Sequence, residues 1–325
     1  MPGLIRATLV SAAFALTTTL SCGASADDYP SRPITIIVSF PPGASTDAVA
    51  RIPRDYMSEA LGQPIIIDNR GGAGGTLGSA MVANAKPDGY TLLVTVNPPI
   101  TMNMYMQKNF PYDAKTAFAP ITMAAQSILA LAVNASVPAK SVPELIEYVK
   151  RNPGKISFGS AGVGSGHHIA GALMNKNAGI DMVHVPYRGT GPAIQDLVAG
   201  QIQVSFGTTP AVLPHHQSGS IRILALAEEK RSPDLPDIPT ISETIPGVVT
   251  NTWVGLFAPA GTPRPIIDKL NKAMNDALRR RDVIEKFKKQ GLSALGTSPD
   301  ELNAIMKKEL AHWGEVIPAI GIQPE

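Results

Sequence analysis

Residues 34–47, ITIIVSFPPGASTD, decide the fold. The stretch begins as a run of β-branched apolar residues, which is typical of a strand buried on both faces of a parallel sheet. Proline, glycine and small hydroxyl residues follow, and apolar residues at helical spacing, such as Val49, Ile52 and Tyr56, come next. The order predicts a strand, a tight turn and a helix.

The same alternation recurs along the chain. Short runs rich in Ile and Val are separated by segments with helical spacing, which predicts an α/β fold with parallel strands. About 300 residues with 44% hydrophobic content can form more than one core, so two lobes are expected. The predicted strands are residues 34–40, 65–68, 92–95, 156–158, 182–185, 202–206 and 221–226.

The first 26 residues have the layout of a secretory signal peptide. Arg6 precedes an uncharged apolar stretch, and the small residues Ala24-Ser25-Ala26 end the segment, so we expect cleavage after Ala26. A retained anchor is disfavoured because the apolar stretch is shorter than the roughly 20 residues that span a bilayer. Lipid attachment at Cys22 stays an alternative, although Thr19 stands where a large aliphatic residue is expected.

Composition excludes several classes of function. Cys22 is the only cysteine and lies in the signal peptide, so the mature chain has no disulfide, no thiol catalysis and no cysteine-based zinc site. The net charge is only +2, and no basic run is longer than Arg279-Arg280-Arg281. Nucleic-acid binding through a broad basic face is therefore not expected.

Metal binding and hydrolysis are also disfavoured. The pairs His167-His168 and His215-His216 are adjacent residues, which point about 100° apart on a helix and do not face one ion. The sequence Gly164-Ser165-Gly166 lacks the spacing of a nucleophile elbow. A secreted esterase remains a minor alternative.

Two glycine-containing turns, one in each half of the chain, are the candidate binding elements. Each follows a predicted strand and precedes a helix, whose free N–H groups can receive an anion. An ordinary turn with Ser45 or Thr46 as N-cap is the alternative. A third segment, residues 69–78, suggests a dinucleotide turn only loosely, and a helix packed closely on the sheet suffices there. The candidate residues are Pro42, Gly43, Ala44, Ser45, Thr46, Asp47, Ser160, Gly164, Ser165, Gly166 and His167.

From about Tyr29 to the C-terminus, the chain resembles the tricarboxylate-transporter periplasmic receptor (TctC or Bug) family. The resemblance lies in many short motifs that occur in one order. They include residues 29–34 (YPSRPI), 41–43 (PPG), 86–90 (KPDGY), 160–167 (SAGVGSGH), 184–189 (HVPYRG), 235–240 (LPDIPT) and 258–263 (APAGTP).

The resemblance implies a type II periplasmic-binding fold, in which two lobes close on a small carboxylate without chemistry or a cofactor. Lobe one would comprise residues 27–122 and 250–325, and lobe two residues 123–249. The partners would be di- or tricarboxylates, acidic amino acids or aromatic acids, and the membrane subunits of a tripartite tricarboxylate transporter. A sensor or partner-subunit role stays open. The two turns would bind the carboxylates, with Asp47 orienting its loop and Phe40 and Tyr187 as apolar walls.

Three positions depart from the family pattern. Ala44 stands where a second glycine is common, and Pro53 interrupts the first helix. Gly207-Thr208-Thr209-Pro210 replaces an acidic residue and Asn. Because Thr208 and Thr209 would line the lobe-two side of the cleft, we expect them to change the ligand preference.

Overall fold

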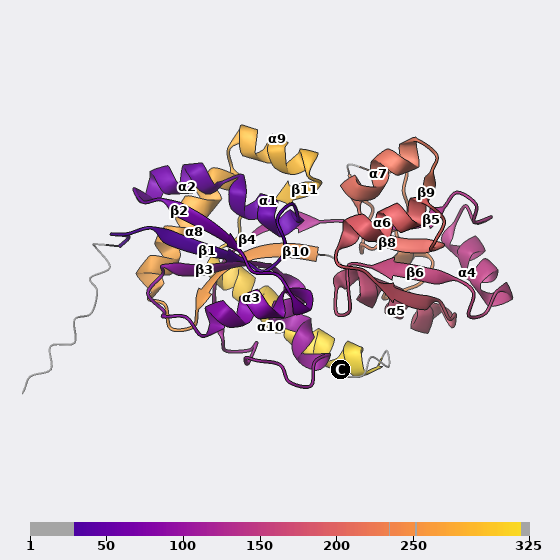
Figure 1. Ribbon diagram of the computed structural model, residues 1–325, viewed down its shortest axis with the longest axis horizontal. Coiled ribbons are helices and arrows are strands. Elements are labelled where there is room, and N and C mark those ends of the chain that lie inside the picture. Colours follow the sequence, from indigo (N-terminus) through magenta and orange to yellow (C-terminus); the bar gives the residue numbers. More distant parts are fainter. Residues whose placement is uncertain (1–28, 234, 251, 320–325) are drawn as a thin grey trace, which may run out of the picture.

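The computed structural model describes residues 29–233, 235–250 and 252–319. The chain forms two α/β lobes that lie side by side (Figure 1), one built on a six-stranded sheet and the other on a five-stranded sheet. The predicted signal peptide, residues 1–26, lies outside the described residues. Within the described ranges, no helix is both long and apolar enough to cross a membrane.

Lobe one has a mixed sheet with strand order β11-β4-β10-β3-β1-β2. The strands β1, β2 and β3 are parallel, and β10 runs antiparallel to both β3 and β4. These strands are β1 (Ile34–Val38), β2 (Ile65–Asn69), β3 (Thr91–Val96), β4 (Phe118–Ser127), β10 (Thr252–Pro259) and β11 (Leu292–Ala294).

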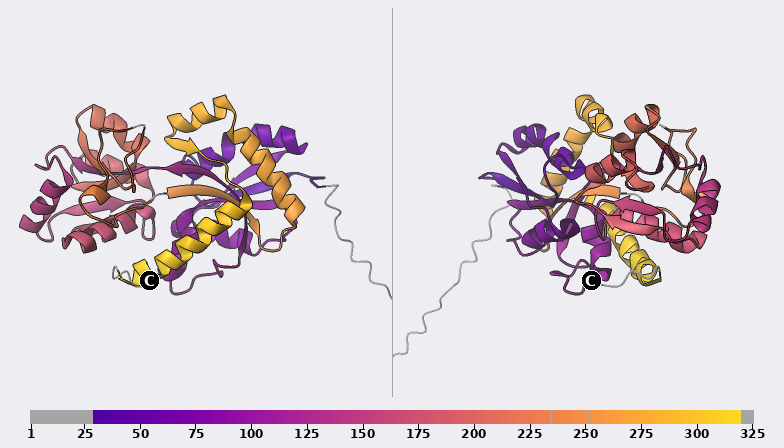
Figure 2. Two further views of the ribbon diagram at one scale, coloured as in Figure 1. Left: turned by 180° about the vertical axis from the view of Figure 1, so that it is seen from behind. Right: turned by 45° about the vertical axis from the view of Figure 1, so that its right-hand side comes forward.

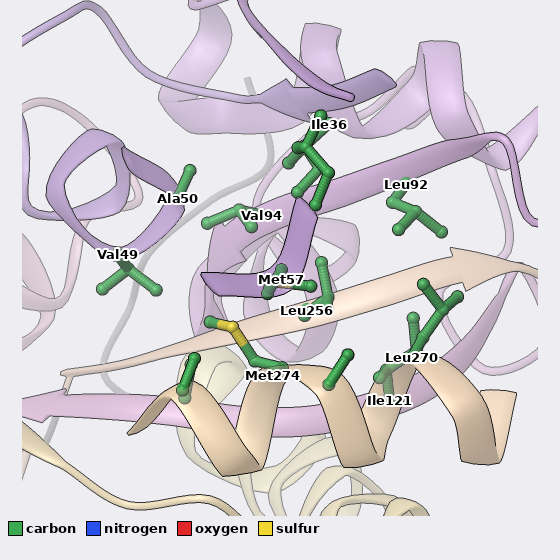
Figure 3. Close-up of a cluster of buried hydrophobic side chains, with 14 of the residues drawn as sticks. Ile36, Val49, Ala50, Met57, Leu92, Val94, Ile121, Leu256, Leu270 and Met274 are labelled. Atoms are coloured by element: carbon green, nitrogen blue, oxygen red, sulfur yellow. The ribbon is translucent and has the colours of Figure 1, made fainter. Parts of the chain in front are cut away.

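Helices cover both faces of this sheet. One face packs against α1, α2, α8 and α9, and the labelled side chains in Figure 3 show how α1, α2 and α8 meet the strands there. The other face packs against α3 and α10. Pro53 ends the first helix as predicted, because α1 stops at Arg51 and α2 starts at Arg54. The helices are α1 (Ser45–Arg51), α2 (Arg54–Leu61), α3 (Thr76–Ala83), α8 (Arg264–Leu278), α9 (Arg281–Lys289) and α10 (Pro299–Ala319), with the short turns η2 (Ala73–Gly75), η3 (Pro98–Met102) and η4 (Asn103–Tyr105).

Lobe two has the strand order β7-β6-β8-β5-β9, with β5 antiparallel to both of its neighbours. Its strands are β5 (Leu129–Asn134), β6 (Ser157–Ser160), β7 (Val183–Pro186), β8 (Val204–Thr208) and β9 (Ile221–Leu226). Its helices are α4 (Val142–Arg151), α5 (Gly166–Ala178), α6 (Thr190–Val198) and α7 (Thr209–Gln217), with the short turn η5 (Ile241–Glu243).

The chain passes between the sheets twice, at Ile128 after β4 and in the segment from β9 to β10. The helix α10 also extends from lobe one toward lobe two (Figure 2), and its residues Trp313 and Ile317 belong to the apolar cluster of lobe two. All seven predicted strands are present. The strands β4, β5, β10 and β11 were not predicted. Because β5, β10 and β11 run antiparallel to their neighbours, the sheets are mixed rather than wholly parallel as predicted.

Candidate ligand-binding site

The turns that follow the parallel strands of each lobe meet at the boundary between the lobes. A Cβ built on Gly74, after β2, would lie 3.4 Å from the carbonyl oxygen of Val163, after β6. A Cβ built on Gly164 would lie 3.1 Å from Oδ1 of Asn103, after β3. The carboxyl ends of the two sheets therefore face one another, which is where open α/β sheets bind ligands.

The first predicted turn leaves free donors at the start of α1. The N-cap residue Ala44 has no side-chain cap, and the N–H groups of Ser45 and Thr46 have no acceptor in the described part of the chain. The N–H of Gly43 is occupied, because it donates to Oδ2 of Asp47 over 3.0 Å. Of this turn's residues, Ser45 and Thr46 thus offer backbone donors to a ligand.

Asp47 is bonded to donors of its own lobe. Its Oδ1 accepts from Arg51 Nε at 2.8 Å and from Asn69 Nδ2 at 2.9 Å. Burial opposes ionisation of Asp47, but the hydrogen bonds from Arg51, Gly43 and Asn69 outweigh it and lower the pKa of the carboxyl. Asp47 therefore holds the loop Phe40–Asp47 in place. This agrees with the expectation that a carboxylate here orients its own loop rather than contacting an anionic ligand.

The second predicted turn forms several hydrogen bonds within itself and still leaves backbone N–H donors free. Ser165 is the N-cap of α5, where its Oγ accepts from the N–H of His168 and donates to the carbonyl oxygen of Gly162 at 2.7 Å. The N–H of Gly164 donates to Nδ1 of His168 at 3.3 Å. The N–H groups of Gly166 and His167 are left without acceptors among the described residues, at the positive end of a helix of 13 residues.

Three histidines surround this turn. Nε2 of His184 lies 2.7 Å from Oγ of Ser160, and its ring stacks on His168. Burial lowers the pKa of His167 and of His168 to about 4, and burial together with His168 lowers that of His184 to about 4. The three rings are therefore uncharged at neutral pH. His184 was absent from the predicted set, and its position on a strand gave no signal of a role here.

His167 is 7% exposed, with Nε2 3.4 Å from Oγ1 of Thr190, and Nδ1 has no partner among the residues that the structure describes. Tyr187 donates its hydroxyl to Oδ2 of Asp196 at 2.7 Å. A Cβ built on Gly159 would lie 3.3 Å from the Tyr187 ring. The Tyr187 hydroxyl is thus engaged within lobe two.

The third glycine segment packs α3 against the end of β1. A Cβ built on Gly78 would lie 2.5 Å from the carbonyl oxygen of Arg70 and 2.9 Å from Cα of Ser39. A Cβ built on Gly75 would lie 2.8 Å from the ring of Phe40. Close packing accounts for these two glycines without a nucleotide.

The loop Gly207-Thr208-Thr209-Pro210, which departs from the family pattern, lies beside Ile128, where the chain first passes between the sheets. Thr208 is the N-cap of α7 without a side-chain cap, and the N–H of Thr209 donates to the carbonyl oxygen of Ile128 at 3.0 Å. Pro210 contacts Gly291 of lobe one. Across residues 29–319, apart from the positions that are not described, no cluster of three His, Cys, Asp or Glu residues could hold a metal ion.

Comparisons with known proteins agree with this arrangement. Residues 49–322 match the tripartite tricarboxylate transporter family receptor. The chain is 35% identical to protein BugT of Bordetella pertussis over 95% of both chains. It is similar to the solved periplasmic binding protein BugD, with 34% identity, a TM-score of 0.82, and coverage of 91% of this chain and 100% of that one.

Two further solved structures carry ligands. The R. palustris protein Rpa4515 with adipate has 33% identity, a TM-score of 0.84, and coverage of 92% of this chain and 100% of that chain. MatC from Rhodopseudomonas palustris with bound malate has 34% identity, a TM-score of 0.81, and coverage of 89% of this chain and 100% of that chain. With its two-lobed α/β fold, the chain belongs to the tripartite tricarboxylate transporter receptor family, whose members are periplasmic solute-binding proteins and not enzymes.

Proposed function

We propose that this protein captures a small carboxylate between its lobes and holds it at the N-termini of α1 and α5. The observation that carries the proposal is the pair of donor sets at the lobe boundary. Ser45 and Thr46 offer N–H groups from lobe one, and Gly166 and His167 offer them from lobe two. A ligand with two anionic ends would reach both sets only when the lobes are closed, so it would favour the closed form.

The surroundings suit an anion held by dipoles rather than by a cation. Arg51, in the last turn of α1, is already paired with Asp47 at 2.8 Å. The histidines of the second turn are uncharged at neutral pH. The relatives with adipate and malate are similar to this chain over most of its length, which supports a carboxylate as the ligand.

Delivery to the membrane subunits of a tripartite tricarboxylate transporter would follow capture. The mature protein would begin at Asp27 after cleavage behind Ala26, and it would work in the periplasm. The sequence predicts a lobe boundary at residues 122 and 123, but the strand β4 spans it, so residues 27–127 with 250–325 and residues 128–249 would move as the two lobes. Since β4 remains in the first sheet as far as Ser127, we propose Ile128 as the first crossing.

Thermal unfolding of the chain from Asp27 tests the ligand class. The panel comprises aliphatic di- and tricarboxylates, acidic amino acids and aromatic carboxylates, and one class should raise the melting temperature. A ligand at a hundred times its dissociation constant adds about 2.7 kcal/mol of stability.

Two N-cap variants make the test specific for the cleft. Ser165→Ala removes the cap at α5 and should reduce the ligand-induced shift. Ser141→Ala removes the equivalent cap of α4, whose Oγ accepts from the N–H of Glu144, and should lower the basal melting temperature but leave the ligand-induced shift. The absence of any shift across the panel would refute the proposal.

A further inference from the structure

Two buried hydroxyl groups lie where the sheet of lobe one ends at the lobe boundary. Ser127 is the last residue of β4 and Thr252 the first of β10, and they are direct partners in the antiparallel pair. They are 2% and 8% exposed, and among the described residues neither Oγ of Ser127 nor Oγ1 of Thr252 has a hydrogen-bond partner. A buried hydroxyl without a partner is unusual in a folded protein and calls for an explanation.

Both hydroxyls leave the sheet on the face that α1 covers. Strand residues alternate between faces, so Thr252 shares its face with Val254, and Ser127 shares its face with Ala125. Val254 and Ala125 belong to the apolar cluster that packs against α1 and α8. Because β4 and β1 end at the same edge of the sheet, the two hydroxyls lie at the edge where α1 begins.

Thr252 also reaches the binding turn of the other lobe. A Cβ built on Gly166, the first residue of α5, would lie 3.1 Å from Oγ1 of Thr252. Gly166 is one of the two residues that offer free N–H groups at that helix end. The Thr252 hydroxyl is thus placed beside the group of lobe two that would hold a carboxylate.

We propose that Ser127 and Thr252 form the floor of the ligand site and select a carboxylate that carries a hydroxyl on the carbon next to its carboxyl group. The inference rests on the proposed function. To the proposed function it adds the residues that would contact the ligand between its two carboxylate-binding ends, and the chemical class of ligand that these residues would prefer.

The chemistry of the floor favours a hydroxyl over the alternatives. A hydroxyl both donates and accepts, so two side-chain hydroxyls complement a ligand group that does the same. A ligand without that group would leave Ser127 and Thr252 buried and unpaired, which costs affinity.

An ammonium group would instead require a carboxylate as its partner. The oxygens of Asp47 already accept from three donors. Glu228 hydrogen-bonds Gln126, which pairs with Trp253 and therefore leaves the sheet on the opposite face. The Asp47 oxygens are therefore occupied, whereas Oε1 of Glu228 has no partner in the described part of the chain, so the acidic amino acids of the melting panel test an ammonium as the alternative.

The test compares matched ligands that differ only in the hydroxyl, by calorimetry on the chain from Asp27. The pairs are succinate and malate, glutarate and 2-hydroxyglutarate, adipate and 2-hydroxyadipate, and phenylacetate and mandelate. In the pair whose length fits, the hydroxy acid should bind at least about tenfold more tightly. Thr252→Val and Ser127→Ala should each bring the ratio of affinities toward one, and Thr252→Ser should preserve it.

Thr122→Val is the matched control. Thr122 is another buried hydroxyl of β4, but its Oγ1 already donates to Oδ1 of Asn275 at 2.8 Å. Its loss should lower the melting temperature without changing the ratio. A ratio of one in the wild-type protein, or an unchanged ratio in both floor variants, would overturn this inference and leave carboxylate capture intact. Failure of every acid in this panel and in the melting panel to bind would overturn both.

A second arm tests the placement without any ligand. The mature chain has no cysteine, so Gly166→Cys combined with Thr252→Cys provides a single pair of thiols. Mild oxidation should join them, because a Cβ at residue 166 and the γ-atom of residue 252 would lie 3.1 Å apart. Oxidation without a cross-link would show that Thr252 does not lie at the start of α5 and would overturn the inference.

Discussion

The imidazole rings of His168 and His184 stack in lobe two with centroids 3.9 Å apart and planes 12° apart. Burial lowers the pKa of both rings, and of the neighbouring His167, to about 4. An unfolded histidine titrates at about 6.5. Between these pH values the unfolded chain binds protons that the folded chain does not, so folding is linked to pH at the binding turn.

The free energy of unfolding should fall as the pH is lowered from about 6.5 to about 4. For His167 alone the difference between the two pKa values corresponds to about 3 kcal/mol. Urea unfolding at several pH values would measure the loss. His167→Gln should flatten the pH dependence in this range, whereas His312→Gln, at an exposed position of α10, should not. Equal pH dependence in all three proteins would contradict the assignment.

Asp47→Asn should lower both stability and ligand affinity. The change removes the negative charge that faces Arg51 and one of the acceptors that hold Gly43 and Asn69. We expect a loss of about 2 kcal/mol in the free energy of unfolding. Because the pKa of Asp47 is lowered, its contribution in the wild-type protein is present above the unfolded pKa and disappears as the pH falls through the folded value.

Asp55→Asn is the control for Asp47. Asp55 pairs with Arg54 on the exposed side of α2, where an ion pair contributes little. Chemical denaturation and ligand titration of both variants would separate the two positions. If both lost the same stability and neither lost affinity, Asp47 would have no special place in the loop.

The predicted strands came from local patterns, and so did both turns that we propose to bind the ligand. A run such as that of Ile34–Val38 is apolar because both faces of a parallel strand are covered, so the strand can be recognised from its own residues alone. The break at Pro53 and the loop-holding role of Asp47 were also predictable, because ring geometry and charge act locally. The antiparallel strand β10 was missed although it is buried throughout, since its place depends on pairing with β3 and β4 far away in the sequence.

The same reason explains the residues of the proposed site that were not predicted. Ser127 and Thr252 show no distinguishing sequence pattern, and they become neighbours only through the pairing of β4 with β10. Asn103 lies beside Gly164 of the other lobe, since a Cβ built on Gly164 would lie 3.1 Å from its Oδ1. His184 reaches Ser160 from the next parallel strand. In each case the partner is distant in the sequence, and no periodicity encodes it.

Glu309→Leu should be strongly destabilising. Its carboxylate accepts from Trp253 Nε1 at 2.7 Å and from Thr101 Oγ1 at 2.9 Å, and so ties α10 to β10 and η3. Leucine would leave Nε1 of Trp253 buried without an acceptor, whereas Thr101 could still donate to the carbonyl oxygen of Asn97 at 3.2 Å, so the cost should be about 2 to 3 kcal/mol. Glu309→Gln should cost less because it keeps an amide oxygen. Denaturant unfolding followed by tryptophan fluorescence would measure both, with exposed Glu315→Leu on the same helix as the control.

Gly291→Ala should oppose closure of the lobes. Gly291 lies between α9 and β11 of lobe one, and a Cβ built on it would lie 1.5 Å from Cγ of Pro210 in lobe two. Since proline has little freedom to retreat, α7 must move away, at a cost of about 1 to 3 kcal/mol to the closed form.

The backbone of Gly291 needs its own control, because its φ of 62° is unfavourable for alanine. Gly62 has a φ of 67°, but a Cβ there would meet no described atom within 4 Å, so Gly62→Ala carries the backbone strain without the contact. Small-angle scattering should give a larger radius of gyration and calorimetry a weaker affinity for Gly291→Ala than for Gly62→Ala. If the two variants have the same size and affinity, Gly291 and Pro210 do not meet in the closed protein.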